Sequence, residues 1–125
     1  MSKPFPPRFD RAVLGVVGEA AAADRYRSGG FDVIACNWRC AAGEIDVIAR
    51  RGDLLVFCEV KTRRGASLGG GYESVTARKQ RKLRQVAEVY LRASPTQAVN
   101  HRFDVASVTM SAEGRVDVEV FEDAF

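Results

Sequence analysis

A chain of 125 residues, 46% of them hydrophobic, can bury one ordinary core and is too short for several domains. Its net charge of +3 is mildly basic, and no stretch approaches the roughly 20 apolar residues of a membrane span. Three cysteines and no apolar signal segment near Met1 exclude a secreted disulfide framework. We therefore expect a single cytoplasmic domain over residues 1–125 that does not enter a membrane.

The first half of the chain predicts one helix and three strands. After a loose, proline-rich lead-in over residues 1–8, a helix is predicted over about 10–28, ended by Gly29 and Gly30. Its apolar residues recur at helical spacing: Phe9, Val13, Val16, Val17 and Ala20. Strands are predicted over 31–37, 44–50 and 54–62, and the last two should form a hairpin about Gly52 and Asp53.

The second half predicts a loop, a helix and two strands. Residues 63–72 read Arg-Arg-Gly-Ala-Ser-Leu-Gly-Gly-Gly-Tyr, a glycine content typical of a mobile loop. A helix over 76–93 has one apolar face, ends before Pro95, and is followed by strands over 102–110 and 116–121. The order αβββαββ predicts an α/β domain with a mixed sheet of about five strands flanked by helices.

Two acidic residues from the predicted hairpin form the centre of the candidate site. With a two-residue turn at Gly52 and Asp53, Arg51 faces Leu54 and Asp46 lies directly opposite Glu59. Like charges in that position repel each other unless a cation compensates them. Mg²⁺ prefers oxygen ligands and usually takes one or two protein carboxylates, which leaves places for water and phosphate. The pair therefore predicts a Mg²⁺ or Mn²⁺ site.

Each residue around this pair has an expected role in phosphodiester cleavage. Asp46 and Glu59 would hold the metal, and the Val60 carbonyl is a further candidate ligand. Lys61 lies two residues from Glu59 on the same strand face, where it would orient the attacking water or stabilise developing negative charge. Glu19 would be an outer acid if the first helix packs beside the hairpin.

Gln80 and the basic residues complete the candidate site. Gln80 lies near the apolar face of the second helix and should either reach the site or satisfy a buried backbone group. Between Lys61 and Arg84 there are eight basic residues against one acid, which favours phosphate contacts with little sequence specificity. The expected nucleic-acid contacts are Arg39, Arg63, Arg64, Arg78, Lys79 and Lys82. DNA is the favoured partner.

Several motifs resemble the bacterial YraN family over nearly the whole chain. Asp46 followed by Glu59-Val60-Lys61 looks like the Asp…(Asp/Glu)-x-Lys signature of restriction-endonuclease-like nucleases. The wider match consists of Gly18-Glu19 with Ala22, Asn37-Trp38-Arg39, residues 43–49, 55–63, 79–83 and 102–105, and Ala124-Phe125.

This resemblance implies a fold similar to archaeal Holliday-junction resolvases and a site of Glu19, Asp46, Glu59 and Lys61. The implied activity is metal-dependent cleavage of branched or structured DNA. Junction resolvases act as dimers, so a homodimer stays open.

Two other classes of function stay open. One is a nucleic-acid-binding protein that keeps the nuclease fold and no longer cuts; the other is a partner-binding protein whose acids form ion pairs, for example Lys61 with Glu44. A zinc site built from Cys36, Cys40, Cys58 and His101 is not expected. Cys58 alternates with Glu59 and so points into the core, and Cys-x3-Cys is not the usual zinc-finger spacing.

Overall fold

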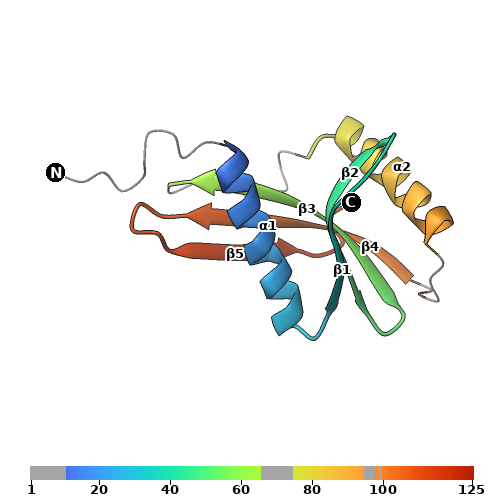
Figure 1. Cartoon of the computed structure of the whole chain (residues 1–125), viewed down its shortest axis with the longest axis horizontal. Coiled ribbons are helices and arrows are strands. Elements are labelled where there is room, and N and C mark those ends of the chain that lie inside the picture. The colour runs from blue at the N-terminus through green and yellow to red at the C-terminus, as the bar shows by residue number, and fades with distance from the viewer. Residues whose placement is uncertain (1–10, 66–74, 95–97, 99) are drawn as a thin grey trace.

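The computed structural model describes residues 11–65, 75–94, 98 and 100–125. These residues form a five-stranded sheet with one helix on each face, shown in Figure 1. The elements are α1 (Arg11–Ser28), β1 (Asp32–Cys40), β2 (Gly43–Arg51), β3 (Leu54–Arg64), α2 (Ala77–Ala93), β4 (Asn100–Met110) and β5 (Val116–Phe121). The predicted order αβββαββ is confirmed, and it is that of a restriction-endonuclease-like core. The predicted lead-in, Pro95 and residues 66–72 of the predicted loop lie outside the described residues.

The sheet is mixed because one of its four strand pairs is parallel. Strands follow the order β1-β2-β3-β4-β5, with β3 and β4 parallel and the other neighbours antiparallel. A parallel pair needs a crossover connection, and α2 provides it between β3 and β4. The hairpin register is confirmed from Arg51–Leu54 through to Val47–Cys58.

Helix α2 forms where its capping and apolar residues predict it. The Thr76 hydroxyl accepts a hydrogen bond from the Lys79 backbone N–H at 3.2 Å, which caps the first turn. The face that points to the sheet is buried and consists of Leu83, Val86, Ala87 and Tyr90. Tyr90 meets Phe57 of β3 edge-on, with 5.9 Å between ring centroids. Burial of this face holds α2 against the sheet.

Helix α1 has nearly the predicted extent, but the apolar residues whose spacing predicts the helix do not form its packing face. Val16 is 68% exposed and Val13 is also exposed, whereas Gly18, Ala22 and Tyr26, four residues apart, are buried. A Cβ added to Gly18 would lie 1.8 Å from the Thr62 Oγ1, so the helix approaches β3 closely enough to require glycine. The face of α1 that contacts the sheet contains small residues. The larger apolar side chains, such as Val13 and Val16, lie on the opposite side of the helix.

Four strands are longer than predicted, and β1 and β3 gain the most at their C-terminal ends. β1 continues to Cys40, and β3 continues to Arg64 because its residues 63 and 64 pair with Thr109 and Met110 of β4. Arg63 and Arg64 therefore belong to the sheet, where a loop was predicted. The cause is non-local: pairing with β4 supplies backbone hydrogen bonds to a segment whose own composition favours a loop.

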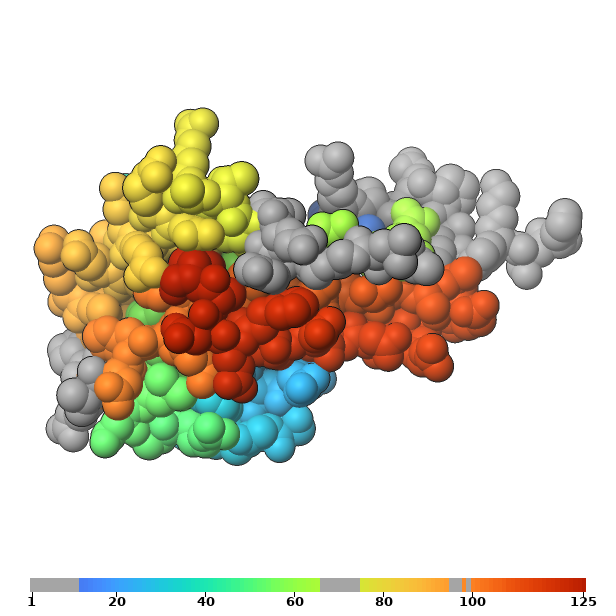
Figure 2. All heavy atoms as spheres, turned by 180° about the vertical axis from the view of Figure 1, so that it is seen from behind, coloured from blue at the N-terminus to red at the C-terminus, as the bar shows by residue number. Residues whose placement is uncertain are grey.

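The C-terminus is fastened to β4 and lies against α2. The Ala124 backbone N–H donates to the Phe103 carbonyl at 2.7 Å, and the Phe103 and Phe125 rings stack at 5.2 Å. The Arg84 guanidinium of α2 lies over the Phe103 ring at 4.8 Å. Figure 2 shows the dark-red C-terminal residues against the yellow residues of α2. Neither described helix combines the length and apolarity needed to cross a membrane.

Candidate metal centre

Asp46 and Glu59 lie where β2 and β3 separate. The backbone ladder between these strands ends at Val47–Cys58, one step before Asp46 and Glu59. Beyond it, the Val60 backbone N–H donates to Asp46 Oδ2 at 2.8 Å, so a carboxylate takes the place of a strand partner. Asp46 is 8% exposed and Glu59 7%, although both are acids. The hairpin thus places two largely buried carboxyl groups at the point where the strands separate.

Burial and mutual repulsion change the protonation of Asp46. Burial, followed by the charge of Glu59, raises the pKa of Asp46 from 3.8 to about 8, while the Val60 N–H partly opposes the shift. The Asp46 and Glu59 carboxyl groups also hydrogen-bond each other. Two carboxylates this close share a proton unless a cation lies with them. The pair is therefore suited to bind positive charge.

Helix α1 and an unusual residue of β1 bring in a third acid. Glu19 Oε1 accepts a hydrogen bond from Asn37 Nδ2 at 2.5 Å. Asn37 has a φ of 54°, a left-handed conformation that non-glycine residues rarely adopt within a strand. Strained backbone of this kind persists only where surrounding contacts hold it, and it is frequent at functional sites. Asn37 thus positions Glu19, a role that its place in a family motif did not reveal.

Glu44 joins the cluster, and the sequence interpretation missed it. One carboxylate oxygen each from Glu19, Glu44 and Asp46 lies within 4.8 Å of the other two. Glu44 precedes Asp46 by two residues on β2, and this alternation is a sequence signal that could have identified it. Three acidic oxygen donors at this spacing fit a hard divalent cation such as Mg²⁺ or Mn²⁺. Asp46 is shared by this cluster and by the pair with Glu59.

The lysines around the site differ in what they contact. Lys79 Nζ of α2 lies 3.0 Å from Glu59 Oε2, so a residue predicted as a nucleic-acid contact is also the ion-pair partner of a predicted metal ligand. Lys61 is half-buried on β3. Glu44, the alternative partner considered for Lys61, pairs instead with Arg39, at 3.3 Å.

Gln80 satisfies a backbone group beside the site. Its Nε2 donates to the Val75 carbonyl at 3.1 Å, which is one of the two predicted outcomes. This bond ties the first turn of α2 to the segment that leads into it. Gln80 therefore supports the position of α2 next to Glu59.

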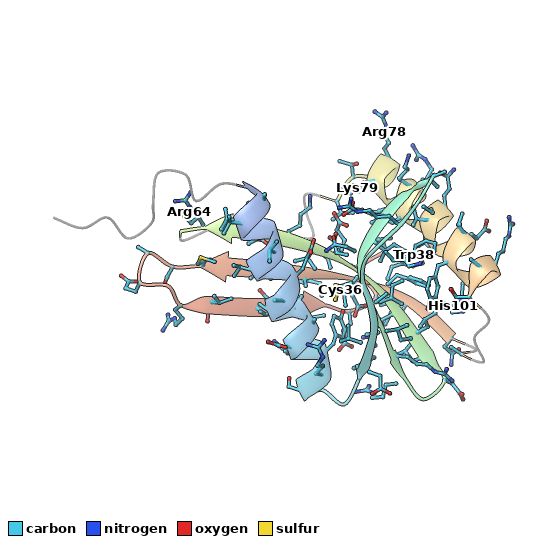
Figure 3. The ribbon with its side chains drawn as sticks, in the orientation of Figure 1. Cys36, Trp38, Arg64, Arg78, Lys79 and His101 are labelled. Atoms are coloured by element: carbon cyan, nitrogen blue, oxygen red, sulfur yellow. The ribbon has the colours of Figure 1, made fainter. Side chains whose placement is uncertain are left out.

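The predicted basic residues fall into separate groups. A hollow of about 430 Å³ on α2 is lined by Thr76, Arg78, Lys79, Arg81, Lys82 and Gln85. Arg64 lies at the far end of β3, well away from Arg78 and Lys79 in Figure 3. The basic surface next to the acids is thus formed by α2, and the Arg63–Arg64 end of β3 lies apart from it.

Cys58 and Trp38 pack in the fold, whereas Cys36 is exposed. Cys58 is buried on the opposite face of β3 from Glu59, as predicted, and burial raises the pKa of its thiol. Figure 3 shows Cys36 and His101 apart from each other. Trp38 meets Tyr90 edge-on at 5.2 Å and is partly buried against the α2 core. The alternative of core packing therefore applies to Trp38.

Comparison with known proteins relates most of the chain to one family. The family model described as "Uncharacterised protein family UPF0102" matches residues 18–108, a range that includes Glu19, Asp46, Glu59 and Lys61. A UPF0102 protein of Parafrankia sp. (strain EAN1pec) is 46% identical over 112 residues, which cover 90% of this chain and 95% of the relative. A UPF0102 protein of Symbiobacterium thermophilum is 44% identical, with coverage of 90% and 95%. One from Caldicellulosiruptor saccharolyticus is 38% identical over 118 residues, with coverage of 94% and 100%.

Proposed function

This chain belongs to uncharacterised protein family UPF0102, the YraN family that its motifs resemble, and we propose that it is a metal-dependent nuclease acting on branched or structured DNA. One observation carries the proposal: Asp46 is buried, and it lies close to Glu59 as well as to Glu19 and Glu44. Clustering several acids around a buried carboxyl group is energetically unfavourable, and catalytic metal sites are a common reason for such clusters.

The proposed roles follow from where the side chains lie. A bound Mg²⁺ or Mn²⁺ would neutralise charge on the scissile phosphate and acidify the attacking water. The cation would be held by acidic residues, namely Asp46, Glu59, Glu19 and Glu44. The Val60 carbonyl is the further candidate ligand. The Val60 N–H fixes the orientation of the Asp46 carboxylate. Lys61, on the strand face of Glu59, would stabilise negative charge that develops on the phosphate.

The basic surface of α2 supports DNA as the substrate. Its hollow lies beside Glu59, because Lys79 both lines the hollow and contacts Glu59. Phosphate contacts from Arg78 and Lys82 would position a DNA backbone without reading its bases. Arg39, Arg63 and Arg64 are the further proposed contacts, toward other parts of a branched molecule.

Two further points belong to the same proposal. Cutting two equivalent strands of a junction calls for two sites, so we propose a homodimer, which light scattering at working concentration would reveal. The three cysteines are free, which suits a reducing cytoplasm.

A second candidate function is nucleic-acid binding without cleavage. The Lys79–Glu59 ion pair favours it, because that pair gives one of the acids a cation from the protein itself. This candidate predicts salt-sensitive DNA binding and no metal-dependent products.

The test is a cleavage assay on junction, flap and linear DNA, each with and without Mg²⁺ or Mn²⁺. We expect metal-dependent products from branched DNA, and their loss in Asp46→Asn, which removes the charge and keeps the shape. Asp53→Asn makes the same change at an exposed hairpin residue and should cut normally. Tight DNA binding without products under every condition would reject the nuclease and favour the second candidate.

A further inference from the structure

Lys79 occupies a position where a helix normally disfavours a cation. The first turn of α2 contains Arg78 and Lys79 and no acidic residue. The N-terminus of a helix carries partial positive charge and stabilises acids, so lysine there weakens the helix unless something compensates. The Glu59 carboxylate compensates Lys79, at 3.0 Å. A lysine at the N-terminus of a helix is unfavourable by itself. Because Lys79 instead contacts Glu59, a candidate catalytic acid, its position indicates a functional reason.

The Lys79 ammonium lies near several acidic side chains and is partly exposed to solvent. The side chain of Glu59 is 8% exposed, whereas that of Lys79 is 45% exposed. The hydrogen bond to Glu59 raises the pKa of Lys79, and the charges of Asp46 and Glu44 add to the effect. The Lys79 backbone is held by the Thr76 cap, but its long side chain retains freedom to turn outward. Figure 3 shows Arg78 of the same turn pointing away from the sheet, so only one of the two cations is drawn to the site.

We propose that Lys79 is the resident counter-ion of the metal centre: its ammonium group holds Glu59 until a divalent cation binds, and then moves to the substrate phosphate. The inference rests on the proposed function and adds a residue to it. A metal ion bound at the Glu59 carboxylate repels the Lys79 ammonium, which contacts one of the two carboxylate oxygens, so metal binding favours the release of Lys79. The released ammonium lines the basic hollow of α2, where a DNA phosphate would lie.

Two consequences follow for binding. Lys79 and the metal compete for Glu59, so the lysine lowers metal affinity in the absence of DNA. Metal binding in turn frees a phosphate contact, so metal and DNA should each increase the affinity of the other.

Calorimetric titration of metal-free protein with Mn²⁺, in the absence of DNA, tests the competition. Lys79→Gln should bind Mn²⁺ about five- to tenfold more tightly than the unaltered protein, the range expected for contacting charged residues. Arg78→Gln is the matched control, since it removes a charge from the same turn and Arg78 forms no ion pair within the described part of the chain. Its Mn²⁺ affinity should stay within about twofold. Unchanged or weaker Mn²⁺ binding in Lys79→Gln would overturn the inference.

Affinity for a labelled DNA junction, measured with and without Ca²⁺ as a cation that supports binding, tests the coupling. The unaltered protein should gain affinity when Ca²⁺ is added, and Lys79→Gln should lose most of that gain. Arg78→Gln should bind DNA more weakly under both conditions and keep the gain. An equal gain in all three proteins would contradict the release of Lys79.

The results also separate this inference from the proposed function. If Lys79→Gln binds Mn²⁺ more tightly and none of the proteins cleaves DNA, the counter-ion role of Lys79 is supported and the nuclease function is rejected. Metal-dependent cleavage with equal Mn²⁺ affinity in both proteins would reject only the counter-ion. Absence of Mn²⁺ binding in the unaltered protein would reject both.

Discussion

Two buried aspartates on the same sheet have opposite surroundings. Asp104 of β4 is fully buried, and it accepts two hydrogen bonds from Arg102, at 2.8 and 2.9 Å, and one from the Tyr26 hydroxyl at 2.6 Å. The Asp123 backbone N–H adds a fourth at 3.0 Å. Asp46 of β2 has the Val60 N–H as its backbone donor, and the neighbouring charges that raise its pKa are those of Glu59 and Glu19. The protein surrounds one carboxylate with its own hydrogen-bond donors and leaves the other among like charges.

Under the proposed function, this difference is the one expected between a structural acid and a metal ligand. Asp104 ties α1, β4 and the C-terminal residues together, and its charge is matched by Arg102. Asp46 lies where two strands part and gains nothing comparable from the fold. Natural proteins tolerate such unfavourable groups mainly where function requires them. The two residues should therefore respond oppositely to the same substitution.

The largest effect is expected from Asp104→Asn. The substitution removes the closer ion-pair partner of Arg102, whose side chain is 16% exposed, leaves it the 3.6 Å pair with Glu122, and weakens the Tyr26 contact. Breaking a buried ion pair in this way costs about 3–5 kcal/mol. Urea denaturation would measure the loss, and Asp117→Asn on exposed β5 should change stability by less than about 0.5 kcal/mol. A loss below about 1 kcal/mol for Asp104→Asn would remove the contrast.

Asp46→Asn should instead stabilise the protein when no divalent metal is present. At pH 8 we expect a gain of about 2 kcal/mol, because an amide keeps the Val60 contact and removes the repulsion from Glu59. Added Mn²⁺ should raise the melting temperature of the unaltered protein and have no such effect on the variant. Destabilisation by Asp46→Asn would make Asp46 a structural acid like Asp104.

The pH dependence of stability should show the same contrast. The folded protein holds the Asp46 proton up to about pH 8, whereas the unfolded chain loses it near the ordinary pKa of 3.8. The contribution of Asp46 to stability is therefore fully present below about pH 4 and is lost as pH rises toward 8. Urea midpoints of metal-free protein between pH 5 and 8 should fall more steeply than those of Asp46→Asn. Parallel curves would show that Asp46 is ionised throughout.

Gly18→Ala should disturb the metal centre through helix packing. The new Cβ would lie 1.8 Å from Thr62 Oγ1, so α1 must move away from β3 and take Glu19 with it. Overpacking of this kind costs about 1–2 kcal/mol, and Mn²⁺ affinity should fall as well. Gly15→Ala is the matched control, because nothing lies within 4 Å of its added Cβ, and it should be neutral or slightly stabilising. Equal behaviour of the two variants would show that the close approach at Gly18 is unimportant.

The smallest stability effect is expected from Asn37→Gly. Glycine adopts the φ of 54° without strain, so stability should change by less than about 1 kcal/mol. The substitution also removes the amide that holds Glu19, and Mn²⁺ affinity should fall several-fold. Calorimetry and melting curves would separate the two effects. Unchanged Mn²⁺ affinity would mean that Asn37 does not position Glu19.

The sequence predicts most features of the β2–β3 hairpin. It predicts few of the contacts that surround the hairpin. Side chains alternate along a strand, and a short turn sets the register, so the facing of Asp46 and Glu59 follows from local rules. The structure brings Glu44 to the same acids by the same alternation. Asn37, by contrast, carries no local signal of its left-handed conformation or of its bond to Glu19.

The sequence alone determined the order of the elements, the α2 packing face, the hairpin register and the family, since each depends on neighbouring residues or on motifs of fixed spacing. Only the tertiary structure decided that α1 packs through Gly18 and that Lys79 contacts Glu59. It also decided that Arg102 and Tyr26 donate hydrogen bonds to Asp104. Most of these contacts join residues distant in the chain, and helical or strand periodicity carries no information on how closely two elements approach. Even Arg102 and Asp104, two residues apart on β4, meet because burial excludes the water that would otherwise solvate both.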